Sequence, residues 1–186
     1  MSEKALGNPA VVGLAGFGGT TLLLQFHNLG LCGTGSVFWA AIFFGGLAQF
    51  VAGMQEFKTG NNFGYAAFST YGAFWMALGG CFLGSGYGIL KITSVEIGWF
   101  LVMFTLITVI FFIGSMKHTG MLAFVFMTLL LGFIFLDIAV LGGIAVFSTI
   151  AAIDLIICAL SAWYLMAHNI YADTGWHLPV GKPWIK

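Results

Sequence analysis

Six apolar runs of about twenty residues each constrain the fold of this sequence more than any other feature. A helix needs roughly 20 apolar residues to cross the hydrocarbon of a membrane. The runs lack the strict alternation of apolar and polar residues that a membrane β-barrel requires. We therefore expect an all-α membrane protein with six transmembrane helices, at Asn8–Phe26, Ser36–Phe57, Phe63–Leu83, Val95–Ser115, Thr119–Leu136 and Gly143–Ala167.

The few charged residues indicate how the helices are oriented. Only 6% of the residues are charged, against about 25% in a soluble domain. Cytoplasmic loops of membrane proteins carry an excess of lysine and arginine. We therefore expect both termini in the cytoplasm and a multi-pass protein of the cell inner membrane, because one predicted side holds all the lysines except Lys91, namely Lys4, Lys58, Lys117, Lys182 and Lys186.

Two units are expected along the chain: a six-helix transmembrane domain over residues 1–170 and a cytoplasmic C-terminal tail over residues 171–186. We expect no signal peptide, because the polar start is only about seven residues long and no small-residue cleavage site follows a short apolar core. No soluble domain is apparent, so any function should lie within the helices.

The first run, which opens "NPAVVGLAGFGGTT", has one polar or small face. Projected at 100° per residue, Gly13, Thr20, Thr21 and Gln25 fall within roughly 80° of Phe17. Polar groups at membrane depth are costly without partners, so this stripe indicates contact with water or a polar solute. The alternative is that glycine and threonine merely allow helices to pack closely.

Two further features extend this pattern. The second run places Gln49 and Glu56 on one face with Gly45, Gly46 and Gly53. In the third run, Tyr71 lies at mid-span, where its hydroxyl needs a hydrogen-bond partner. At the start of the chain, Asn8 before a proline is typical of a helix start, where free N–H groups could hold an anion. A helix start without any ligand explains that dipeptide equally well.

Enzyme motifs are not found in this sequence, which contains no HExxH, GxSxG or Walker loop. The histidines and cysteines are dispersed, so we expect no metal site, no cofactor and no catalytic residue. Asp154 is an acid well inside the last predicted span, which makes it a functional candidate. Its carboxyl could instead be satisfied by a neighbouring helix, or the span could be misplaced.

Long segments of the chain resemble the acetate uptake transporter family, the succinate–acetate permeases. The resemblance covers nearly the whole chain and is carried by "NPAVVGLAGFGGTT", "FHNLG", "FFGGLAQFVAGMQEFKTGNNFGYAAFSTYGAFW" and "LPVG". It implies a homo-hexamer with a separate pathway in each protomer for acetate and, in some members, succinate. By motif it implies an apolar constriction of Phe17, Tyr71 and Leu129, flanked by the polar residues Asn8, Thr20, Thr21, Gln49 and Glu56.

A mechanism follows as a hypothesis. A bare carboxylate is costly in hydrocarbon, so the pathway should offer hydrogen-bond donors or carry the protonated acid. We expect Asn8, Thr20, Thr21, Gln49 and Tyr71 to donate. Glu56 at the mouth would repel anions unless protonated, so transport should rise as pH falls. Glu56 and Asp154 are the candidates for proton coupling.

Several alternatives stay open. The protein could be a channel or a proton symporter. An uncharged polar bore also suits a neutral solute such as urea or a short amide. A non-transporting scaffold or a lipid enzyme is disfavoured by the polar stripes and by the missing catalytic acids. The expected partners are small carboxylates, membrane lipid and further copies of the chain, and no nucleic acid.

Overall fold

The computed structural model describes residues 7–186, and within this range every regular element is helical. Six helices of the described chain are long and apolar enough to cross a membrane, which confirms the predicted fold class. Lys4 lies outside the described residues. The elements are α1 (Ala10–Asn28), α2 (Thr34–Trp39), the π-helical segment η1 (Ala40–Ala48), α3 (Gln49–Thr59), α4 (Asn62–Gly86), α5 (Ser94–Ser115), α6 (Gly120–Val140) and α7 (Val146–Ala172).

Helix ends coincide with side chains that satisfy free backbone groups. The Asn61 side chain accepts a hydrogen bond from the Gly64 N–H at the start of α4, and Thr119 does the same for Leu122 at the start of α6. Gly60 ends α3 with a φ of 78°, a left-handed conformation that glycine adopts without strain. Helix α6 runs to Val140 rather than ending at Leu136, so Asp137 is helical rather than in a loop.

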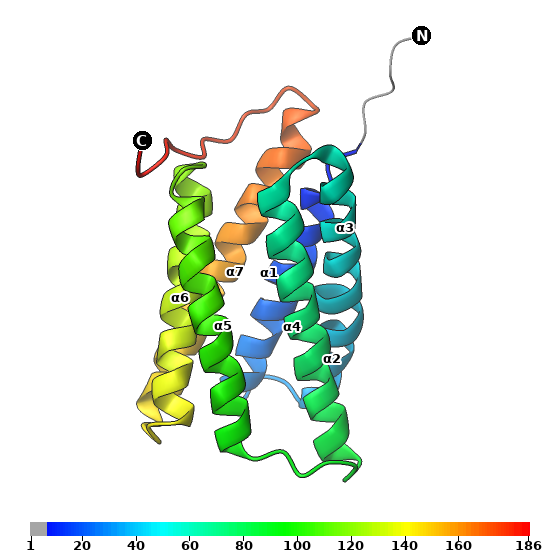
Figure 1. The fold of residues 1–186 in the computed structure, drawn as a ribbon, viewed down its shortest axis with the longest axis vertical. Coiled ribbons are helices and arrows are strands. Elements are labelled where there is room, and N and C mark those ends of the chain that lie inside the picture. Colours follow the sequence, from blue (N-terminus) through cyan, green and yellow to red (C-terminus); the bar gives the residue numbers. More distant parts are fainter. Residues whose placement is uncertain (1–6) are drawn as a thin grey trace.

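The helices, seen from the side in Figure 1, pack in a ring around a central space that holds two cavities. In order around the ring, α7 packs on α1, α1 on the rod formed by α2, η1 and α3, the rod on α4, and α5 on α6, which returns to α7. The ring closes between α4 and α5, the neighbouring pair whose backbones approach least. Large apolar side chains such as Leu106 and Ile110 cover the outer face of α5, as a lipid-facing helix requires.

Side chains, rather than close backbones, close the seam between α4 and α5. The rings of Phe74 and Phe100 stack at a centroid distance of 5.4 Å, and those of Phe63 and Phe111 meet edge to face at 5.7 Å. Such pairs add to the free energy of burying the rings themselves. The central space is therefore enclosed on this side by aromatic side chains.

Close packing on the opposite side depends on small residues. A methyl group added at Gly16 of α1 would lie 2.5 Å from the Phe44 carbonyl oxygen of η1. At Gly45 of η1, an added methyl would lie 2.6 Å from the Thr20 hydroxyl. Gly16 and Gly45 thus serve close packing between α1 and η1.

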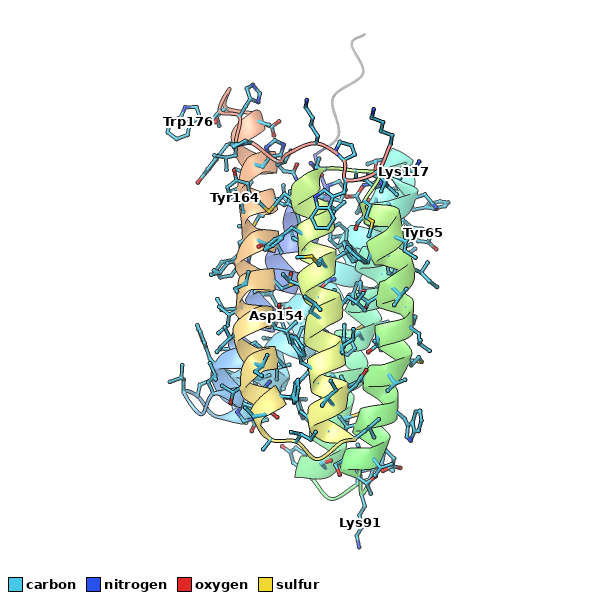
Figure 2. All side chains as sticks on the ribbon, turned by 90° about the vertical axis from the view of Figure 1, so that its left-hand side faces the viewer. Tyr65, Lys91, Lys117, Asp154, Tyr164 and Trp176 are labelled. Atoms are coloured by element: carbon cyan, nitrogen blue, oxygen red, sulfur yellow. The ribbon has the colours of Figure 1, made fainter. Side chains whose placement is uncertain are left out.

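One end of the bundle, which we call the tail end, carries Asn8, the turn between α5 and α6, and the C-terminal segment 173–186 (Figure 1). The segment crosses this end and is held there, because the Met121 N–H donates to the Val180 carbonyl at 2.8 Å and the Trp184 N–H to the Met116 carbonyl at 3.0 Å. Lys117 lies at the tail end and Lys91 at the opposite end (Figure 2).

Candidate functional site

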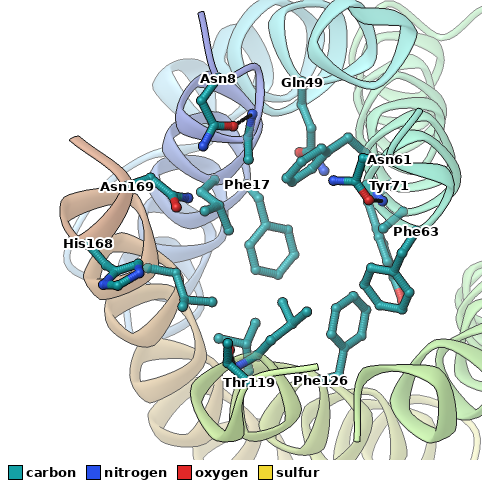
Figure 3. A pocket seen from close by; sticks show the side chains of 18 of the residues that line it. Asn8, Phe17, Gln49, Asn61, Phe63, Tyr71, Thr119, Phe126, His168 and Asn169 are labelled. Carbon is teal, nitrogen blue, oxygen red and sulfur yellow. Dashed lines mark hydrogen bonds between the residues drawn. The ribbon is translucent and has the colours of Figure 1, made fainter. Parts of the chain in front are cut away.

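A cavity of about 280 Å³ lies inside the ring at the tail end. Its rim comes from helix ends and the tail: Asn8, Asn61 at the start of α4, Thr119 before α6, and His168 with Asn169 near the end of α7 (Figure 3). Its walls are mainly apolar and aromatic. Within the described residues, no lysine, aspartate or glutamate side chain lines it, so it offers amides, hydroxyls and one imidazole to a small solute.

A second cavity, of about 30 Å³, lies on the other side of Phe17, Tyr71 and Leu129, since these three residues line both cavities. The lining residues with polar groups are Thr21, Gln25, Tyr71 and Trp75, and the Trp75 indole N–H has no partner in the described chain. The volume suffices for about one or two water molecules. The three predicted constriction residues therefore stand where two internal spaces of one protomer meet, and each is at most 6% exposed. Their action on a solute stays a prediction.

Tyr71 is held by a hydrogen-bond chain that sets the direction of its proton. Its hydroxyl lies 2.8 Å from the Thr108 hydroxyl, and Thr108 lies 2.6 Å from the Phe104 carbonyl. A carbonyl only accepts, so the single Thr108 proton goes to Phe104 and Tyr71 must be the donor to Thr108. The Tyr71 proton is engaged, which is a correction to the expectation that Tyr71 donates to an anion. Tyr71 offers its ring to the passage, edge-on to Phe17 at 6.1 Å.

Gln49 points into the larger cavity from the first residue of α3 (Figure 3). It is 1% exposed, and its Oε1 is buried without a hydrogen-bond partner in the described chain. A buried polar atom without a partner is uncommon, because leaving it unpaired costs about 1–3 kcal/mol. Gln49 is thus one of the polar groups at this site that lack a partner in the described chain, together with Thr21 and Trp75.

The predicted polar stripe of α1 divides in the structure. Asn8 lines the larger cavity, its Oδ1 accepting from the Ala10 N–H at 3.0 Å, and Thr21 lines the smaller one with an unpartnered buried hydroxyl. Thr20 lines neither, since its hydroxyl points to the Ala40 carbonyl at 3.4 Å. Gln25, one turn beyond Thr21, lines the smaller cavity. Gln25 is not among the predicted site residues, although its spacing of four residues from Thr21 places both side chains on one face of α1.

Glu56 lies behind the wall of the larger cavity rather than on it. Its carboxylate is 2% exposed and accepts hydrogen bonds from Thr59 at 3.1 Å and from the Asn61 amide at 3.0 Å. Asn61 in turn lines the cavity together with Gly64. Glu56 therefore orients a lining amide instead of standing in the mouth, where we expected it.

Asp154 is half-buried on α7, at mid-height in the bundle (Figure 2). Its Oδ2 has no partner in the described chain, and it lines neither cavity, although the next residue, Leu155, lines the smaller one. Asp137 is a second acid at membrane depth, which the sequence pattern placed in a loop. It accepts a hydrogen bond from Thr105 at 2.6 Å and so links α6 to α5.

The polar rim was missed from sequence, apart from Asn8. Asn61 and Thr119 are recognisable from sequence as helix caps. His168 and Asn169 are recognisable as polar residues near the end of a span. Neither pattern reveals which helix ends lie together around the cavity. Among residues 7–186, no three histidine, cysteine, aspartate or glutamate side chains come close enough to hold a metal ion.

Comparison with known proteins places these features in a family context. The sequence model of the GPR1/FUN34/yaaH family matches residues 1–181. The chain is 38% identical to the succinate-acetate/proton symporter SatP of Escherichia coli K12, over 98% of this chain and 99% of the relative. It is 30% identical to acetate permease A of Emericella nidulans, over 74% of this chain and 51% of the relative. A solved structure described as that of the bacterial acetate channel SatP matches with a TM-score of 0.91 and 37% identity, covering 95% of this chain and 100% of that one.

Proposed function

Because the chain belongs to the GPR1/FUN34/yaaH family, we propose that it carries acetate and related short carboxylates, succinate among them, across a membrane through a pathway inside each protomer. The family match confirms the resemblance to acetate uptake transporters that the sequence motifs indicated. The relatives named above are transport proteins rather than enzymes. The protein is accordingly a multi-pass membrane transporter rather than an enzyme.

The single observation that supports this pathway is the pair of cavities within one chain, which share Phe17, Tyr71 and Leu129 as a common wall. A solute moving between the two ends of the bundle would meet this wall. The three side chains present apolar surface, which suits the methyl group of acetate and removes water from it. We propose that they form the constriction that limits the size of the transported acid.

Polar groups on either side of that wall would hold the carboxylate. Gln49 lies on the side of the larger cavity, where its Nε2 can donate to a carboxylate and its unpartnered Oε1 can accept only from the O–H of a protonated acid. The unpartnered hydroxyl of Thr21, on the side of the smaller cavity, can donate to either form. A carboxylate moving from one to the other exchanges one set of hydrogen bonds for another. Conduction requires such weak, repeated binding, and a lysine in the passage would hold the anion too strongly. Asn8 would serve as a further contact at the rim.

Five finer features belong to the same proposal. The protein forms a homo-hexamer in the cell inner membrane, as the family resemblance implies, with both termini in the cytoplasm. The placement of Lys117 at the tail end and Lys91 at the opposite end supports this orientation. Residues 171–186 then form a cytoplasmic tail. Transport is coupled to protons, with Glu56 and Asp154 as the acids that could carry them.

Uptake of labelled acetate into proteoliposomes tests the function. We expect uptake above that of empty liposomes, competition by unlabelled acetate and succinate, and no competition by urea. An imposed inward proton gradient should raise the rate. Competition by urea instead of acetate would replace the proposal with the neutral-solute channel. A rate that is flat between acid and neutral pH at a fixed anion gradient would count against proton coupling alone.

A further inference from the structure

The imidazole of His168 lies on the rim of the larger cavity, near the end of α7 (Figure 3). It is half-buried, with Asn169 beside it. Histidine is the side chain that most readily changes its charge between about pH 5 and 8. Among the described residues, His168 is the only imidazole that lines the cavity.

The tail fixes which nitrogen of His168 carries the hydrogen. Its Nδ1 lies 2.7 Å from the Leu178 carbonyl oxygen. A carbonyl can only accept, so Nδ1 must be the donor in the neutral ring as well as in the charged ring. In the neutral ring Nε2 is consequently the bare nitrogen, able to accept a hydrogen bond or a proton. Protonation therefore changes the Nε2 side of the ring and leaves the contact with Leu178 intact.

Three successive carbonyls of the tail are held, which keeps the ring in place. His168 donates to Leu178, the Tyr164 hydroxyl donates to Pro179 at 2.8 Å, and the Met121 N–H donates to Val180 at 2.8 Å. These bonds tie the tail to α7 and to the start of α6. His168 is thereby positioned from its Nδ1 side by a segment that has no need to move when the ring changes charge.

We propose that His168 is a proton-exchanging carboxylate site at the tail end of the larger cavity. With the neutral ring, Nε2 accepts a hydrogen bond from the O–H of an undissociated short carboxylic acid. The proton can pass from that oxygen to Nε2, which leaves a carboxylate paired with an imidazolium whose new N–H donates to it. The O–H bond breaks and the N–H bond forms, and the total charge of the pair stays zero. This inference rests on the proposed function and names the group that receives the acid at the rim.

Within residues 7–186, the other titratable and charged groups near His168 are hydrogen-bonded elsewhere or exposed, apart from the buried Oε1 of Glu56, which has no partner. Tyr164 on α7 is bonded to the tail, and Glu56 across the cavity is bonded to Thr59 and Asn61. The ring of His118 packs on Phe63 at 4.8 Å, and His177 and Lys182 on the tail are exposed. The remaining lining side chains beside His168 are amides, a hydroxyl and apolar groups, so a bound carboxylate has His168 as its cationic partner.

Acetate binding to the purified full chain at about pH 6 and about pH 8 tests this proposal, because a short carboxylic acid stays almost fully ionised over this range. We expect the native protein to bind acetate about three- to tenfold more tightly at the lower pH. The test variant is His168→Asn, whose amide can still donate to the Leu178 carbonyl but cannot titrate. We expect it to bind acetate equally at both pH values. His177→Asn, in the exposed part of the tail, is the matched control and should keep the native pH dependence.

A second measurement uses the native protein and needs no folded variant. Binding and protonation are reciprocally linked, so saturating acetate at constant pH should increase the protonated fraction of His168, followed by NMR of its imidazole nitrogens. An unchanged His168 signal, or native pH dependence in His168→Asn, would overturn the proposal while leaving acetate transport standing. Failure of the native protein to bind or transport acetate at either pH would instead overturn the proposed function.

Discussion

Replacement of Gln49 by leucine separates a binding role from a structural one, because the two roles predict opposite effects on stability. The side chain is 1% exposed, and its Oε1 has no partner in the described chain. Leucine has a similar volume and no polar atoms. If the amide of Gln49 exists to hold a solute, Gln49→Leu removes an unpaired polar group whose burial costs about 1–3 kcal/mol. We therefore expect the melting temperature of the purified protein to stay the same or rise.

The same replacement should weaken acetate binding. A hydrogen bond to a charged group contributes about 1.5–3 kcal/mol, which corresponds to roughly a ten- to 150-fold loss of affinity. We expect this loss in calorimetric binding of acetate, and a higher acetate concentration for half-maximal uptake in proteoliposomes. Gln55→Leu is the matched control, because Gln55 lies exposed on the same helix and away from both cavities. A lowered melting temperature together with unchanged affinity would show that Gln49 supports the fold and would refute the reasoning.

Three other experiments test the remaining parts of the pathway. Phe17→Ala joins the two cavities, so selectivity for acetate over butyrate should fall by about tenfold or more in uptake assays; unchanged selectivity would remove Phe17 from the constriction. Thr108→Val leaves the Tyr71 hydroxyl buried without its acceptor, which should cost about 1–3 kcal/mol in thermal or chemical unfolding, and adding Tyr71→Phe should recover most of that loss. Asp154→Asn should abolish stimulation of uptake by a proton gradient and leave acetate affinity unchanged; full stimulation in the variant would exclude Asp154 from coupling.

The helices could be predicted from sequence because a membrane leaves a long apolar segment few other conformations. A chain in hydrocarbon must satisfy each backbone group internally, so the six long runs determine six helices almost by themselves. Errors in the bounds of the runs lie at their ends, where capping and the depth of the membrane compete. Asp137 illustrates this: its charge predicts a helix end, but the structure accommodates it within α6 through a hydrogen bond from Thr105 on the neighbouring helix α5.

The site was harder to predict from sequence. The direction in which a side chain leaves its helix can be calculated, but that direction does not identify the helix or cavity that the side chain meets. Thr20 and Thr21 belong to the same broad stripe, yet one meets the π-helical segment and the other a cavity. The sequence pattern did not indicate that segment. The rim residues, His168 among them, come together only through the assembly of helix ends and the return of the tail, which no local periodicity encodes.

The seam between α4 and α5 has a consequence for how the passage discriminates by size. Its two helices meet through rings such as Phe74 and Phe100, and rings can turn while every backbone hydrogen bond of both helices stays intact. A slightly larger solute can thus pass when these aromatic rings rotate about their side-chain torsions, and each added carbon costs a small amount of free energy. The cutoff against larger molecules should consequently be gradual, with successive homologues slowed rather than refused at a sharp threshold.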